Sequence, residues 1–162
     1  MYGRLAPAMA FVVSAAIACG AGQSAASRAS NVPLVRGLYD SFGKGDVPAV
    51  LAALDSAVEW RAAEGMLYAD RSPYIGRDAV AQGVFQRIVS EFDSLAVVPQ
   101  SFIDAGDIVV VEGRYKAKNR ATGVRVDAQF AHVYHVRNGK VVRLQQYTDT
   151  RQWALAVARQ PR

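Results

Sequence analysis

The sequence predicts an α+β domain in which helices come first and an antiparallel sheet follows. Apolar residues recur at helical spacing up to Ser94, and β-rich runs separated by turn residues follow it. Helices followed by a meander favour this class over a doubly wound parallel sheet, in which strands and helices alternate. The 162 residues allow one domain plus a modest extension, because single domains typically contain roughly 100 to 150 residues.

Three helices are expected before Ser94. Asn31 is expected to cap the first, with Pro33 in its first turn, and its apolar positions are Leu34, Val35, Leu38, Tyr39 and Phe42. Asp46 is expected to cap a second, shorter helix. A strand at residues 57–60 and a loop at 61–77 lead to Asp78, which we expect to open the third helix. Its stripe contains Val80, Val84, Phe85, Ile88, Val89 and Phe92.

Four β-rich runs are expected after Ser94, at residues 95–104, 108–119, 125–137 and 140–149. A terminal helix is expected at 150–158. Asn138-Gly139 is typical of a two-residue type I′ hairpin turn, which needs positive φ at both positions. This turn places Arg137 opposite Lys140 and so predicts the register of the last hairpin.

That register predicts which side chains share a face of the sheet, since directly opposed residues project to the same side. The expected pairs on one face are Val136 with Val141, Tyr134 with Arg143, His132 with Gln145, Phe130 with Tyr147, and Ala128 with Asp149. If the helices cover this face, its polar groups must line a cavity, as in small-molecule sites. The other face carries Ala131, Val133, Val142 and Leu144, and we expect it to pack on a second subunit.

Residues 1–30 are typical of a secretory signal. Arg4 precedes an uncharged run from Leu5 to Gly20, and small residues follow where a peptidase could cut. Cys19 lies in a stretch resembling a bacterial lipobox, so a lipid anchor there would be the only membrane attachment. Cleavage among residues 24–27 and a misassigned start codon are the alternatives. We expect an exported, periplasmic or extracellular protein whose folded domain is 31–162.

Composition excludes several classes of function. Cys19 is the single cysteine, which excludes an intrachain disulfide. The net charge of +5 comes with both signs mixed along the chain, so nucleic acid is not an expected partner. His132 and His135 point to opposite faces of a strand and cannot chelate one metal together. No metal site is therefore predicted.

Several short stretches carry a family resemblance. They are Tyr39–Asp46, Val58–Trp60, Pro73–Arg77, Phe130–Val133, Gly139–Val142 and Gln146–Asp149. With the order of elements, they resemble the SnoaL-like, ketosteroid-isomerase-related branch of the nuclear-transport-factor-2-like superfamily. The resemblance implies a cone-shaped half-barrel with helices packed on a curved antiparallel sheet. It also implies a hydrophobic pocket for a small organic ligand, often a homodimer, and in the enzymes often a pocket carboxylate acting as acid or base.

Two residues are the catalytic candidates. Asp149 ends the last strand and would be a base if desolvated, or else the cap of the terminal helix. His132 would be a base or would orient Asp149 or a ligand, unless it is a structural histidine. Trp60 and Tyr74 are expected as pocket wall and lid, or else as ordinary core, and the expected pocket lining also includes Phe130, Gln145 and Tyr147.

The predicted function is binding of a small hydrophobic organic ligand by an exported protein. Isomerase, cyclase or hydratase chemistry without a cofactor is one expectation. A non-catalytic ligand-binding or dimerisation module is the alternative.

Overall fold

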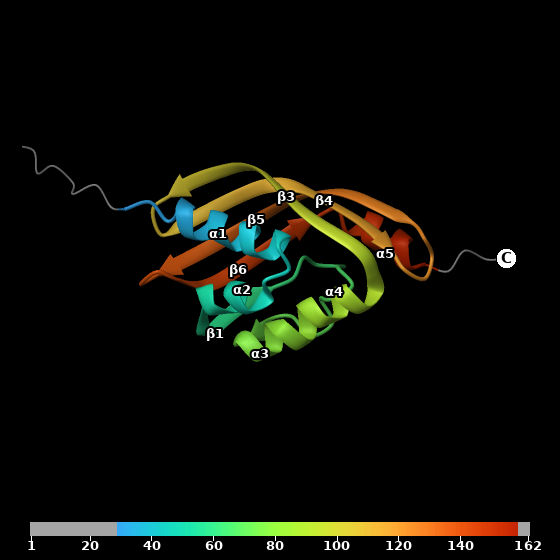
Figure 1. Ribbon diagram of the computed structural model, residues 1–162, viewed down its shortest axis with the longest axis horizontal. Helices are drawn as coiled ribbons and strands as arrows, with labels where there is room; N and C mark the ends of the chain where they lie inside the picture. The colour runs from blue at the N-terminus through green and yellow to red at the C-terminus, as the bar shows by residue number, and fades with distance from the viewer. Residues whose placement is uncertain (1–28, 159–162) are drawn as a thin grey trace, which may run out of the picture.

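A curved, open sheet of six strands in the order β2-β1-β6-β5-β4-β3 forms the frame of the domain (Figure 1). The computed structural model describes residues 29–158. The strands are β1 (Leu54–Arg61), β2 (Tyr74–Ile75), β3 (Phe92–Ala105), β4 (Ile108–Asn119), β5 (Arg125–Arg137) and β6 (Lys140–Thr148). The predicted α+β class is confirmed. The sheet is mixed rather than wholly antiparallel, because β1 runs parallel to β6.

The helices are α1 (Val32–Gly43), α2 (Val47–Ala53), α3 (Arg77–Val80), η1 (Ala81–Phe85), α4 (Gln86–Glu91) and α5 (Thr150–Val157). We call the sheet face toward α1–α4 the inner face and the opposite face the outer face. The Asp46 cap is confirmed, since its side chain accepts a hydrogen bond from the Ala49 amide at 2.9 Å. Asn31 does occupy the N-cap position of α1, but its side chain does not cap the helix. The Asn31 side-chain amide donates to the Gly106 carbonyl at 2.8 Å instead.

The predicted third helix contains one π-helical turn, η1, between α3 and α4. The helical segment as a whole begins with α3 at Arg77, after Gly76, one residue before the expected start. Val80, Val84 and Phe85 are buried as predicted, but Val89 is 67% exposed. The π-turn adds a residue to the helical repeat and rotates the following turn, so Val89 faces solvent while Ile88 still reaches the core.

The last hairpin begins in the predicted register and then departs from it. Asn138 and Gly139 have positive φ values of 51° and 69°, as the turn requires. Arg137 lies opposite Lys140 and Val136 opposite Val141, but a bulge follows at once. Beyond it, the partners are His135 with Arg143, Tyr134 with Leu144, Val133 with Gln145, His132 with Gln146, and Ala131 with Tyr147. The pairs expected beyond Val136 are therefore wrong by one residue.

The bulge has a clear energetic reason. Without it, Arg143 would project beside Tyr134 on the inner face, where a charge would lose its hydration. With it, Leu144 takes that place and is fully buried. The same shift moves Gln145 and Tyr147 to the outer face and brings Gln146 to the inner face.

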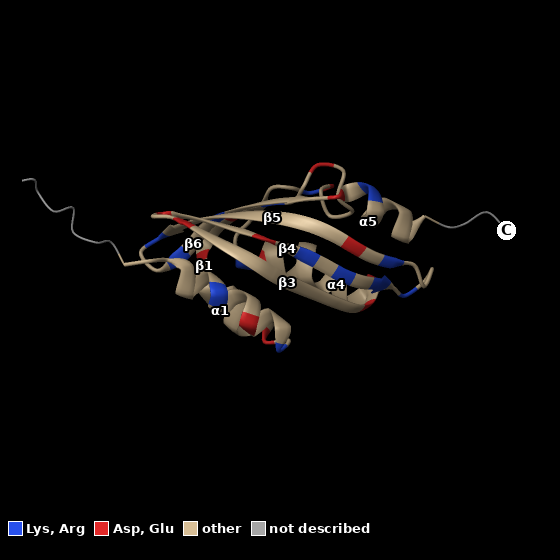
Figure 2. Cartoon of the chain, turned by 90° about the horizontal axis from the view of Figure 1, so that it is seen from above, with Lys and Arg blue, Asp and Glu red and all other residues tan. Residues whose placement is uncertain are grey.

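Charged residues gather on the hairpin between β4 and β5. Figure 2 shows positive residues alternating with uncharged ones along β4 toward this hairpin. Two arginines pair with aspartates, Arg114 with Asp127 at 2.7 Å and Arg120 with Asp93 at 2.8 Å. Lys116 and Lys118 are exposed, so the charges lie in solvent and away from the core between the sheet and α1–α4.

Candidate functional site

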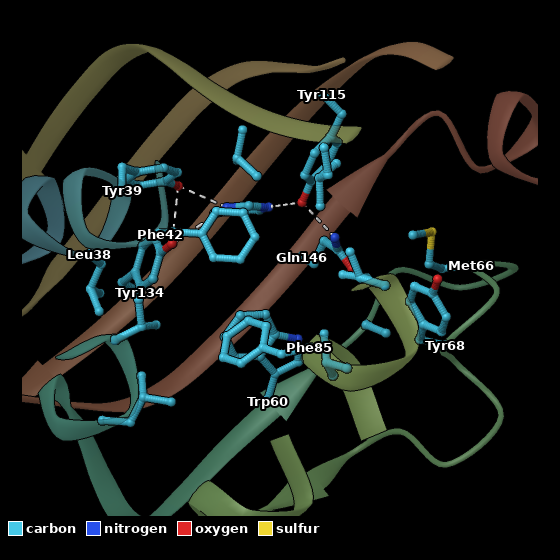
Figure 3. Close-up of a pocket in the computed structure, with 18 of the residues that line it drawn as sticks. Leu38, Tyr39, Phe42, Trp60, Met66, Tyr68, Phe85, Tyr115, Tyr134 and Gln146 are labelled. Carbon is cyan, nitrogen blue, oxygen red and sulfur yellow. Dashed lines mark hydrogen bonds between the residues drawn. The ribbon is translucent and has the colours of Figure 1, made fainter. Parts of the chain in front are cut away.

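An apolar cavity of about 70 Å³ lies between the inner face of the sheet and the helices (Figure 3). Most of its wall is aliphatic or aromatic and comes from α1, α2, β1, η1, α4 and β3. Polar atoms reach it from the tyrosines, from His132 and from Gln146. The lining residues are Leu38, Tyr39, Phe42, Val50, Leu54, Trp60, Ala62, Met66, Tyr68, Val84, Phe85, Ile88, Leu95, Val97, Tyr115, His132, Tyr134, Gln146 and Trp153.

The period of the strands explains how the polar groups come together. Successive side chains of a strand point to opposite faces, so His132 and Tyr134 of β5 both point inward. Tyr115 of β4 reaches the same face, because its partner in the register is Ala128, which is also buried. The bulge in β6 adds Gln146, and α1 supplies Tyr39 from the opposite side.

These five residues form one buried chain of hydrogen bonds, which we call the polar chain (Figure 3). The Tyr134 hydroxyl lies 3.1 Å from that of Tyr39, and the Tyr39 hydroxyl lies 2.8 Å from His132 Nδ1. On the other side of the ring, His132 Nε2 lies 2.5 Å from the Tyr115 hydroxyl. The Gln146 side-chain amide donates to that hydroxyl at 2.6 Å. The polar chain therefore connects residues of α1, β4, β5 and β6 along the cavity wall.

The Ala63 amide favours the orientation of Gln146 in which the side-chain NH₂ group faces Tyr115. The Ala63 amide donates to Gln146 Oε1 at 3.4 Å. A flipped side chain would place two N–H groups against each other at this point, with no acceptor between them. Gln146 therefore presents a donor to Tyr115.

Every member of the polar chain is uncharged near neutral pH. Burial lowers the pKa of His132 to about 3, so its ring is neutral. Burial also raises the pKa of Tyr39, of Tyr115 and of Tyr134 above its ordinary value. Among residues 29–158, no Asp, Glu, Lys or Arg lines the cavity, and no cluster of three or more His, Cys, Asp or Glu could hold a metal ion.

Three aromatic rings pack against one another in the cavity wall. The Phe85 ring centroid is 5.8 Å from that of Phe42 and 5.6 Å from that of Trp60. Phe85 is buried, whereas Phe42 and Trp60 are half-buried. An apolar cavity that admits benzene measures about 150 Å³, roughly twice the volume found here. A ring-sized ligand therefore needs these side chains to move.

Of the predicted site residues, His132 and Trp60 line the cavity. Phe130 is buried behind the wall, where its ring stacks on His132 at 4.2 Å between centroids. Tyr74 is buried below η1, and its hydroxyl donates to the Tyr68 carbonyl at 2.7 Å. The Tyr74 ring packs so closely on Gly83 that a side chain there would overlap it. Phe130 and Tyr74 thus support the site from outside the lining.

The structure places Gln145, Tyr147 and Asp149 away from the cavity, which corrects the predicted arrangement. The bulge turns Gln145 and Tyr147 to the outer face, and Tyr147 is 55% exposed. Asp149 precedes α5 and accepts a hydrogen bond from the Gln152 side chain at 2.9 Å, which lowers its pKa. Asp149 and Tyr147 border an open hollow that also contains Glu112 and Arg114 of β4. Asp149 and His132 are therefore not brought together.

Sequence reasoning did not single out Tyr39, Tyr115, Tyr134 or Gln146 as site residues. Tyr39 matched the helical stripe of an ordinary core residue, and Tyr134 was placed inward but beside Arg143. That pairing was the available signal, since an arginine on a helix-covered face argues for a shift of one residue. Such a shift brings Leu144 and Gln146 inward.

Comparison with known proteins agrees with the fold. The family model of the SnoaL-like domain matches residues 35–144 of this chain. An NTF2-like protein of Burkholderia thailandensis is 31% identical, with a TM-score of 0.77 over 81% of this chain and 99% of that one. An NTF2-like protein of unknown function from Burkholderia pseudomallei is 27% identical, with a TM-score of 0.74 over the same shares.

A Jannaschia protein classed among SnoaL-like polyketide cyclases shares the fold at 20% identity, with a TM-score of 0.68 over 81% of this chain and 93% of that one. No curated protein matches the chain.

Proposed function

Because the chain belongs to the SnoaL-like domain family, we propose that it binds a small, mainly apolar organic molecule in the cavity. The observation that carries this proposal is an apolar wall interrupted by a single buried polar chain. Small-molecule sites typically combine a hydrophobic lining with a few polar groups that orient the ligand. Phe42 and Trp60, whose rings are half-buried, are the entrance in this proposal.

A pair of matched substitutions tests the binding site. Val84 lines the cavity, whereas Val89, on the next turn of the helix, is exposed. Val84→Phe should fill the cavity and abolish binding of a bicyclic probe such as 1-indanone, followed by amide shifts in NMR spectra. Val89→Phe should leave binding unchanged. Equal binding by both variants would place the site elsewhere.

Cyclase- or isomerase-type catalysis is the second candidate. It is supported by the hydroxyl–imidazole–hydroxyl arrangement around His132, which could pass a proton between Tyr39 and Tyr115, and by the fold shared with the Jannaschia protein classed among polyketide cyclases. A histidine with a pKa of about 3 is a weak base at neutral pH. A carboxylate base would have to come from outside the lining, so binding is the leading proposal.

Export of the mature domain is a further part of the proposal. Its support is the uncharged run after Arg4, and this run and Cys19 lie outside the described residues. Within residues 29–158, no helix is long and apolar enough to cross a membrane. Intact mass of the native protein should show a mature start at Cys19 or within residues 25–31. A cytosolic species starting at Met1 would contradict export.

We also propose that the outer face of the sheet forms a homodimer. Ala131 and Val133 are half-buried there, and Tyr147 is largely exposed. Leu144, which was expected on this face, lies inside the core instead. Light scattering should give twice the mature mass, and Val133→Glu should give a monomer. A monomeric wild type at micromolar concentration would contradict the dimer.

A further inference from the structure

The polar chain has a definite number of hydrogens to distribute. Its order is Tyr134, Tyr39, His132, Tyr115 and Gln146, joined by the distances given above. The neutral imidazole carries one N–H and one acceptor nitrogen. Each tyrosine hydroxyl carries one hydrogen, and Gln146 donates into the chain at its far end.

Counting these hydrogens leaves one of them without a partner. The three hydroxyls and the imidazole supply four hydrogens, but only three contacts join them to one another. The contact to Gln146 uses a hydrogen of the amide. In the described part of the chain, no further acceptor lies within hydrogen-bond distance of these hydroxyls. The remaining 3.5 Å separation, between the Tyr134 hydroxyl and His132 Nδ1, is beyond normal hydrogen-bond length.

The tautomer of His132 decides where the unused hydrogen lies. With the proton on Nε2, the ring donates to Tyr115, which also accepts from Gln146, so the Tyr115 hydrogen is unused. With the proton on Nδ1, donation runs from Gln146 through Tyr115 and His132 to Tyr39. The unused hydrogen then lies on Tyr39 or Tyr134. All three tyrosines line the cavity, so in either tautomer the unused hydrogen belongs to a residue of the cavity wall.

We propose that the cavity selects ligands that carry a neutral hydrogen-bond acceptor, such as a ketone or aldehyde carbonyl, for this unused hydroxyl hydrogen. A buried polar group without a partner is costly, and a carbonyl oxygen supplies an acceptor without bringing another hydrogen. This inference rests on the proposed function, since it concerns a ligand in the same cavity.

The charges around the cavity explain why the acceptor is neutral. The described lining contains no lysine or arginine, and its histidine is uncharged. A carboxylate ligand would lose its hydration without gaining a counter-ion. An amine would bring further hydrogens to a chain that already has one too many. The remaining wall is apolar and fits a hydrocarbon body.

A matched pair of probes tests the inference in the wild-type protein. 1-Indanone and 1-methyleneindane have nearly the same shape, but only the ketone has an acceptor. Calorimetry or NMR titration should show the ketone binding roughly three- to tenfold more tightly, the range expected for one net hydrogen bond. The carbonyl stretch of the bound ketone should lie below its position in hexane, as in a hydrogen-bonded carbonyl.

Substitution of Gln146 tests the count itself. Ionised glutamate at this position accepts from Tyr115 and gives all four hydrogens a partner, so Gln146→Glu at about pH 9.5 should lose the preference for the ketone. Gln146→Met removes the amide without adding an acceptor and should keep it. Gln145→Glu makes the same chemical change on the outer face and should also keep it.

The outcomes separate the two proposals. A ketone preference that Gln146→Glu abolishes supports the inference, and the wild-type comparison decides even if that variant fails to fold. Equal affinity for ketone and alkene, with an unshifted carbonyl stretch, would overturn the acceptor rule and leave the proposed binding function standing. Failure of both probes to bind would overturn the proposed function and this inference together.

Discussion

Replacing His132 should remove a large part of the acid sensitivity of folding. Burial lowers the pKa of His132 from 6.5 to about 3 in the folded protein. Below pH 6.5, His132 binds a proton in the unfolded chain but stays unprotonated in the folded protein. The free energy of unfolding therefore falls as the pH drops and stops falling near pH 3. Each pKa unit corresponds to about 1.4 kcal/mol. The loss should thus be about 2 kcal/mol at pH 5 and about 5 kcal/mol below pH 3.

Urea unfolding at about pH 8 and about pH 5 measures this loss. Between the two, wild type should lose about 2 kcal/mol more than His132→Gln, which has no titrating ring. His135→Gln is the matched control, because His135 faces the other side of the same strand. It should keep the wild-type dependence. If His132→Gln and wild type lose stability in parallel, His132 is not held neutral by burial.

Three further predictions concern packing and the site. Tyr115→Phe should lower the free energy of unfolding by about 2 to 4 kcal/mol, because it leaves a buried amide and a ring nitrogen without their partner. Tyr134→Phe, whose hydroxyl has one partner within normal hydrogen-bond length, should lose only about 1 kcal/mol in the same urea titration; equal losses would contradict the assignment of Tyr115 as the central link. Gly113→Ala should cost about 2 kcal/mol or more in thermal melts, since its Cβ would overlap a carbonyl of the paired strand. Gly37→Ala, in open space on α1, should be neutral or stabilising, and similar melts for both would refute the close approach. Asp149→Asn should leave the affinity for 1-indanone unchanged by titration, because Asp149 lies outside the cavity; a clear loss would return Asp149 to the site.

Local signals predicted most of the fold because turn residues carry direct conformational information. The strands β4 and β5 match their predicted bounds. The predicted runs were separated at Gly106, Gly123 and Asn138-Gly139, and all of these residues adopt the positive φ of tight turns in the structure. The parallel pairing of β1 with β6 was not predicted. No local pattern reports which distant strand will lie beside an edge.

The candidate site was predicted only in part because side-chain direction depends on register. A single bulge after Val141 reverses the facing of every later residue of β6. The face to which Tyr115 points depends in the same way on the register of the hairpin between β4 and β5. The turn of that hairpin is too long for the sequence to determine its register. His132, whose position on β5 does not depend on β6, was correctly placed on the inner face.

The parallel pairing of β1 with β6 has a consequence for the order of folding. The strands from β3 to β6 form a meander of hairpins. In contrast, the hydrogen bond between Ala63, which follows β1, and Gln146 of β6 joins positions 83 residues apart. Contacts between distant positions form slowly, because a long loop must close before they stabilise the chain. We therefore expect the meander to form early and β1 and the N-terminal helices to dock late. Four members of the polar chain lie on the meander and would be in place before Tyr39 docks with α1. The cavity would then form in the last step of folding.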